Sequence, residues 1–160
     1  MRKIITIFTI LIQVVSTFTL MFFMYMIFAF IDSDFGMEGV FGLIVFQPIF
    51  AIILTIITVI LCFIIGLPIR LSISINSWWI KHFYIAIIGV VFGIVLIVLS
   101  LLPDYMETIQ IEKDGEIIIK QIPNISLSIF GWFLTAFSIL HIYPPKIITN
   151  KIEEFFEKKL

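Results

Sequence analysis

The sequence predicts an all-α integral membrane protein: a four-transmembrane-helix bundle with both termini in the cytoplasm, a small outer β-hairpin and a C-terminal interfacial helix. The first supporting observation is composition. Of the 160 residues, 61% are hydrophobic and only 13% are charged, whereas soluble domains are about 45–50% apolar and about 25% charged. A chain of this length cannot bury so much apolar surface in water. The second observation is that the few charges separate by sign along the chain.

Four uncharged runs are each long enough to cross a bilayer, which requires about 20 mostly apolar residues. They lie at about residues 4–31, 40–67, 82–102 and 125–143 of a single membrane domain, residues 1–160. The first run is longer than the apolar core of a signal peptide, so we expect it to remain as an uncleaved helix. The second run contains Pro48. This proline either kinks the helix or begins it, in which case residues 39–47 form a re-entrant or interfacial lead-in.

The polar segments between the runs predict which side of the membrane each one faces. Acidic residues concentrate in the first and third connections. Basic residues concentrate in the N-terminus, the second connection and the tail, as Arg2, Lys3, Arg70, Lys81, Lys146, Lys151, Lys158 and Lys159. Basic segments stay in the cytoplasm. The outer segments then carry a net charge of −6 and the inner segments +5. Two cytoplasmic termini require an even number of spans, which favours four.

The third connection predicts a β-hairpin over residues 107–122, because Asp114-Gly115 is a strong turn signal between β-branched residues. A three-residue loop over 113–115 would build an apolar face from Ile109, Ile111, Ile117 and Ile119. A two-residue loop would instead pair Lys113 with Glu116. The three-residue loop is preferred because it puts the four isoleucines on one face. We expect that face to pack against the outer leaflet, the first connection or another subunit.

Two further segments are expected at the cytoplasmic surface. Residues 68–81 alternate like a strand, yet a short helix is preferred because an unpaired strand at the interface leaves backbone groups unsatisfied. Residues 149–160 predict an amphipathic helix lying in the interface. Its apolar face consists of Ile152, Phe155, Phe156 and Leu160.

The residue types exclude several kinds of chemistry. None of the four runs contains Asp, Glu, Lys or Arg, whereas a proton-coupled carrier needs a titratable group near the membrane midplane. The single cysteine, Cys62, rules out an intramolecular disulfide, a CxxC pair and a thiolate metal site. The chain has no phosphate-binding glycine loop and no cluster typical of hydrolases. We therefore expect no enzyme, cofactor or bound metal, and the scattered basic residues do not predict nucleic-acid binding.

Small residues mark two predicted helix-packing surfaces. Gly89 and Gly93 form a GxxxG motif in the third run, and Gly131 with Thr135 forms a similar pair in the fourth. Such ridges allow backbones to approach closely. The contact is expected within one chain, because the third and fourth helices are neighbours, although a contact between subunits stays open.

The polar residues inside the runs are expected to make packing hydrogen bonds. Gln13 and Gln47 could also line a polar path with nearby serines and threonines, and His141 could act as a ligand or a pH-responsive group. Bonding across helices is the preferred interpretation for the glutamines, and an interfacial hydrogen bond for the histidine. The predicted interfacial anchors are Trp78, Trp79 and Tyr143.

These observations favour a non-enzymatic interaction or accessory protein, such as an immunity protein, a regulator or a subunit of a complex. Its expected partners are the lipid bilayer and another membrane protein or a second copy. The alternative is an oligomeric channel or small-solute transporter that uses uncharged polar residues. The heavy use of isoleucine, phenylalanine and lysine favours an AT-rich bacterial genome, and hence the bacterial cytoplasmic membrane.

Overall fold

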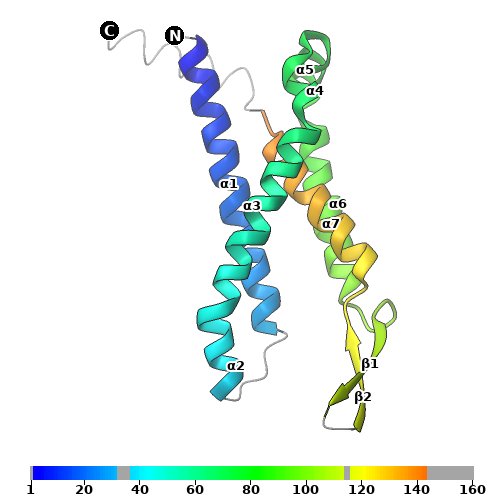
Figure 1. The fold of residues 1–160 in the computed structure, drawn as a ribbon. Helices are drawn as coiled ribbons and strands as arrows, with labels where there is room; N and C mark the ends of the chain where they lie inside the picture. Colours follow the sequence, from blue (N-terminus) through cyan, green and yellow to red (C-terminus); the bar gives the residue numbers. More distant parts are fainter. Residues whose placement is uncertain (1, 32–36, 114–115, 144–160) are drawn as a thin grey trace.

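The computed structural model describes residues 2–31, 37–113 and 116–143, so the predicted helix at 149–160 lies outside the described residues. The described chain is mostly helical, with one small two-stranded antiparallel sheet (Figure 1). Two helical segments, Ile7–Ile31 and Gly39–Ile65, are long and apolar enough to cross a membrane. A bent pair, Ile73–Lys81 with Tyr84–Ser100, passes the same test only when both helices are taken together. These lengths are compatible with a membrane protein.

The first helix pair consists of α1 (Arg2–Ile31) and α3 (Gln47–Ile65). A short helix, α2 (Met37–Phe41), and a π-helical turn, η1 (Gly42–Phe46), lead into α3. The N–H of Gln47 donates to Gly42 O, which closes the wide π turn. Pro48 follows in the first turn of α3, where its missing N–H costs least. Residues 39–47 are therefore helical and continuous with α3.

The second connection is helical, as preferred from the sequence. It consists of α4 (Leu67–Leu71) and α5 (Ile73–Lys81), which precede α6 (Tyr84–Ser100). Ser72 separates the two short helices and caps α5, because its hydroxyl accepts from Ile75 N–H at 3.5 Å. The axes of α5 and α6 differ by 73°. The third run is therefore a shorter helix with an angled lead-in.

The hairpin consists of β1 (Glu107–Lys113) and β2 (Glu116–Ile122). Lys113 pairs with Glu116, so the loop has two residues and the preferred three-residue register is wrong. Two-residue Asp-Gly loops are the commonest hairpin connections, because their twist matches the natural twist of the strands. As a result Ile117 and Ile119 lie on the face opposite Ile109, and they are 69% and 67% exposed.

The last described helix, α7 (Ile125–Leu140), joins the two halves of the molecule. It packs along α6 and also contacts α1 and α3. The buried core brings together Met21 of α1, Cys62 of α3 and Leu140 of α7. Figure 1 shows the α1/α3 and α6/α7 pairs diverging toward the hairpin. The helix has 16 residues and ends before the predicted limit at 143.

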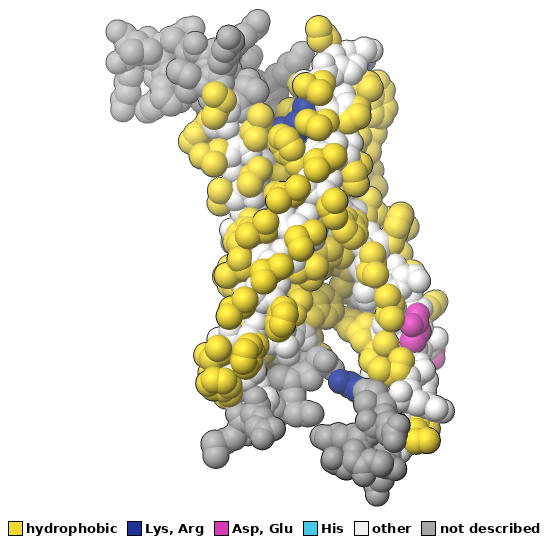
Figure 2. Space-filling model, in the orientation of Figure 1, with side chains coloured by type: hydrophobic (Ala, Val, Ile, Leu, Met, Phe, Trp, Pro, Cys, Tyr) yellow, Lys and Arg dark blue, Asp and Glu magenta, His cyan; other side chains and the backbone are white. Residues whose placement is uncertain are grey.

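Large hydrophobic side chains cover the outside of the helices. Ile44 and Ile65 at the two ends of the second candidate span are 68% and 63% exposed, for example. Figure 2 shows hydrophobic side chains along the full length of the visible face, with acidic side chains only near the hairpin end. A soluble monomer rarely exposes so large an apolar surface, whereas lipid covers it without cost.

Candidate functional site

Three side chains from three different helices converge on the carboxyl end of α7. Each side chain donates one hydrogen bond to a backbone carbonyl: Gln13 Nε2 to Ile142 O (2.6 Å), Arg70 Nη2 to Leu140 O (2.9 Å) and Trp79 Nε1 to His141 O (2.8 Å). We call this set the carbonyl junction. The last carbonyls of a helix have no intrahelical partner, and leaving them unpaired in a membrane costs several kcal/mol each. The junction therefore fastens α1, α4 and α5 to the end of α7.

Arg70 is the charged centre of the carbonyl junction. Its Nη2 also donates to Gln13 Oε1 at 3.0 Å, and its guanidinium lies over the Phe63 ring at 5.1 Å. Burial lowers the pKa of the Arg70 guanidinium from its ordinary value, while the Tyr143 phenol acts in the opposite direction. The guanidinium stays charged at neutral pH. A cation at this position also interacts favourably with the negative end of the α7 dipole.

His141 lies directly after α7 and is fully buried. Its Nδ1 lies 2.7 Å from Phe137 O, and because a carbonyl only accepts, Nδ1 carries the proton. Nε2 has no hydrogen-bond partner among the described residues. That atom is packed against Gly66, where an added Cβ would collide with the ring. The arrangement is a close contact between the end of α3 and the end of α7, with no room for a ligand at Nε2.

The hydrogen bond of Gln47 lies at a different height along α1 from that of Gln13. Its Oε1 accepts from the Tyr25 hydroxyl at 2.8 Å, which links the start of α3 to α1. Tyr25 and Gln13 are twelve positions apart on α1, a separation of about 18 Å along the helix axis. The two glutamines therefore do not belong to one polar cluster.

Most of the buried hydroxyl groups in the described helices bond within the chain. Thr17 and Thr58 donate back to the carbonyls of Gln13 and Leu54 at 2.7 and 2.8 Å. Trp132 of α7 donates to Thr58 Oγ1 at 3.0 Å, which connects α7 to α3. Thr55 differs, because its buried Oγ1 has no partner among the described residues.

The small residues of α6 and α7 face one another at very short range. A Cβ on Gly93 would lie 2.9 Å from Gly131 O and closer still to the Thr135 hydroxyl. A Cβ on Gly131 would lie 2.7 Å from Gly93 O. Gly89, one turn away, faces the Ser138 side chain. The structure thus places all four predicted packing residues in one contact between α6 and α7 of the same chain.

The three predicted interfacial anchors differ in their surroundings. Trp78 is 49% exposed and its ring lies 4.7 Å from that of His82. Trp79 points inward, where it bonds the carbonyl junction and packs edge-on against Phe137. Tyr143 is partly buried and lies close enough to Arg70 to interact with it electrostatically.

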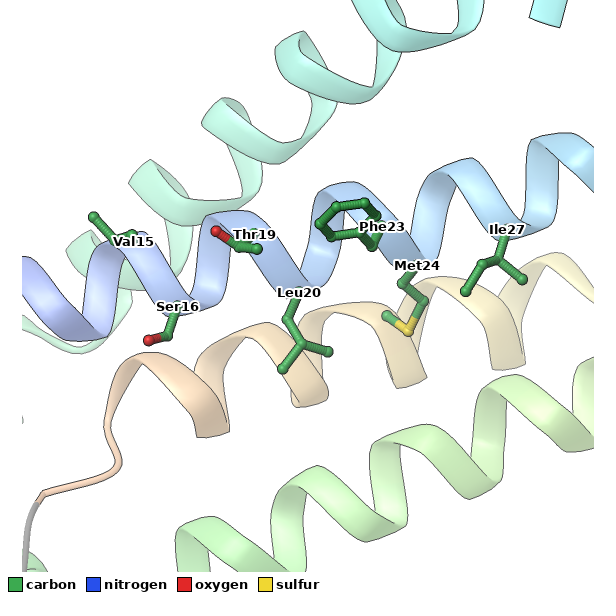
Figure 3. A pocket seen from close by; sticks show the side chains of 7 residues that line it. All are labelled: Val15, Ser16, Thr19, Leu20, Phe23, Met24 and Ile27. Carbon is green, nitrogen blue, oxygen red and sulfur yellow. The ribbon is translucent and has the colours of Figure 1, made fainter.

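An open groove of about 470 Å³ runs along one side of α1. Figure 3 shows its lining, in which Leu20 and Met24 point toward α7. The complete lining consists of Val15, Ser16, Thr19, Leu20, Phe23, Met24 and Ile27. Five of these seven side chains are apolar, so the groove suits hydrocarbon better than water.

Within the described ranges, no three His, Cys, Asp or Glu side chains come together in a way that could hold a metal ion. Comparison with known proteins finds no matching family model, no matching curated protein and no matching solved structure.

The carbonyl junction was the main feature missed in the sequence. Gln13 was identified as an intramembrane polar residue and Arg70 only as a charge that sets orientation. They are 57 positions apart, so no local pattern connects them. The one available signal was that Arg70 follows the predicted cytoplasmic end of the second run, where an arginine can reach the last carbonyls of a neighbouring helix.

Proposed function

We propose that the chain crosses the bacterial cytoplasmic membrane four times, with both termini inside and the hairpin outside. Support comes from the separation of basic and acidic segments, which follows the positive-inside rule. The order of α1, α3, α6 and α7 agrees with alternate crossings (Figure 1). At 16 residues α7 covers about 24 Å, which is less than an average hydrocarbon core of about 30 Å. Residues 141–143 and local thinning of the bilayer supply the difference.

Within this topology the protein acts as a non-enzymatic interaction protein: an accessory, immunity or regulatory subunit that works by contact with a membrane partner. The observation that carries this proposal is the use of both intramembrane glutamines in bonds within the chain. Gln13 bonds Ile142 O and accepts from Arg70, and Gln47 accepts from Tyr25. Amides committed in this way, at depths about 18 Å apart, supply no continuous lining for a solute path.

Flux through liposomes tests the proposal against a channel or transporter. Purified protein is reconstituted beside a Gln13→Leu and a Gln47→Leu variant, and ion conductance and solute uptake are recorded. The proposal predicts no flux above that of empty liposomes for all three proteins. Reproducible flux of the natural sequence that either substitution abolishes would establish the transport alternative instead.

Site-specific photo-crosslinking in native membranes tests the interaction itself. A photoreactive residue at Ile117 reports from the exposed face of the hairpin, and one at Ile57 reports from the surface of α3; both side chains are exposed. The proposal predicts a discrete protein adduct from the hairpin position and lipid adducts from the helix. Lipid or solvent adducts alone from both positions would count against a protein partner at this surface.

A further inference from the structure

The connection between α3 and α6 exposes hydrophobic and basic side chains side by side at one end of the molecule. The second candidate span ends at Ile65 and α6 begins at Tyr84, so residues 66–83 lie at the edge of the bilayer. Figure 1 places α4 and α5 at the end of the molecule opposite the hairpin. Leu71 and Ile73 at their junction are 76% and 89% exposed. Surfaces of this kind at the membrane edge contact the interfacial region of the lipid.

The direction of α5 fits a position in the membrane surface. Its axis departs from that of α6 by 73°, so α5 does not continue the path of α6 across the bilayer. With α6 close to the membrane normal, α5 lies close to the membrane plane. The helix is held there from its inner side, where Trp79 bonds His141 O. Its outer side is left to lipid.

Trp78 and Lys81 are neighbours on that outer side. They are three positions apart on α5, a spacing that puts them on one face, and both are exposed. No described residue accepts a hydrogen bond from the Trp78 indole, which is free to donate to a lipid oxygen. Tryptophan rings and lysine ammonium groups both favour the headgroup level.

Charge identifies the kind of lipid that this surface suits. Arg70 and Lys81 are the sole charged residues between Glu38 and Asp104, so the segment is basic and has no acid to compete for them. Anionic phospholipids supply the complementary charge. We propose that the Trp78–Lys81 face of α5 binds the phosphate of an anionic phospholipid headgroup, with Arg70 adding to the positive potential from inside the carbonyl junction. This inference rests on the proposed membrane topology and is independent of the proposed protein partner.

Native mass spectrometry of the full chain in detergent tests the inference directly. Phosphatidylglycerol and phosphatidylcholine are titrated separately, and the ratio of their apparent dissociation constants measures preference for the anionic lipid. The natural sequence should prefer phosphatidylglycerol, and Lys81→Gln should reduce that preference about fivefold. Lys120→Gln in the hairpin is the matched control, because it removes the same charge at the other end, and should leave the preference unchanged. Equal binding of both lipids, or equal loss in the two variants, would overturn the inference.

A second measurement reports from the proposed site. The chain has three tryptophans, and a variant with Trp79→Phe and Trp132→Phe keeps Trp78 as its one tryptophan fluorophore. In nanodiscs of mixed composition, brominated phosphatidylglycerol should quench Trp78 more strongly than the same fraction of brominated phosphatidylcholine, and high salt should remove the difference. Equal quenching at low salt would contradict the proposed site. The lipid titration of the full chain decides the question if this variant does not fold.

Discussion

Replacing Gly93 with alanine tests the contact between α6 and α7 most sharply. The new Cβ would lie 2.9 Å from Gly131 O, whereas a carbon and a carbonyl oxygen in contact prefer about 3.3–3.6 Å. The helices must therefore separate by about 0.4 Å or more along a packed seam. Overpacking of this kind destabilises a protein by about 1–3 kcal/mol, and the higher helix propensity of alanine relative to glycine offsets up to about 1 kcal/mol of that loss. We expect a net loss of about 1–2 kcal/mol in the free energy of unfolding.

The assay is reversible unfolding in mixed micelles, followed by circular dichroism as the fraction of denaturing detergent increases. Gly42→Ala is the matched control, because an added Cβ there meets no atom within 4 Å. It should unfold at the same point as the natural sequence or slightly later. Thr135→Ala combined with Gly93→Ala should restore only part of the loss, since the clash with Gly131 O remains. Equal stability of the Gly93→Ala and Gly42→Ala proteins would refute the reasoning.

Four further substitutions test three other contacts with the same unfolding assay. Gln13→Leu and Arg70→Gln should each lower the free energy of unfolding by about 1.5–3 kcal/mol. The double variant should lose less than the sum of the two, because the two side chains share one hydrogen bond. Strictly additive losses would show that the two side chains do not interact. Gly66→Ala should cost about 1–3 kcal/mol, since its methyl group meets the ring of His141; an unchanged midpoint would contradict that contact. Trp132→Phe should lose only about 0.6–1.7 kcal/mol, the range for one interhelical bond, and a loss above about 3 kcal/mol would mean that the indole does more than donate to a threonine.

Apolar run length was enough to find the helices, because hydropathy and chain length are local properties. The first two candidate spans, Ile7–Ile31 and Gly39–Ile65, fall within two residues of a predicted limit at three of their four ends. The presence of a hairpin was equally accessible, since an Asp-Gly turn between β-branched residues is a short-range signal. The bend between α5 and α6 could not be predicted from the local pattern, since α5 is bonded to a distant part of the chain: Trp79 donates to His141 O, 62 positions away.

One error and one omission have different causes: competing local rules in the hairpin, and partners distant in the sequence at the end of α7. In the hairpin, gathering isoleucines on one face favoured a three-residue loop, while turn geometry and the pairing of Lys113 with Glu116 favoured two residues. The observed register has the two-residue loop. At the end of α7, residue type indicated that Gln13 would bond across helices but not to which group. The answer needed the fold, because its partners Arg70 and Ile142 are 57 and 129 positions away.

The most direct test of the proposed membrane topology is a paired reporter experiment in bacterial cells. A reporter active only in the cytoplasm is fused after Leu160, and one active only after export is inserted in the turn between β1 and β2. Four crossings predict activity from both fusions. An inactive reporter after Leu160 together with an active one in the hairpin would mean that α7 does not cross, and the account of four spans with both termini inside would be wrong.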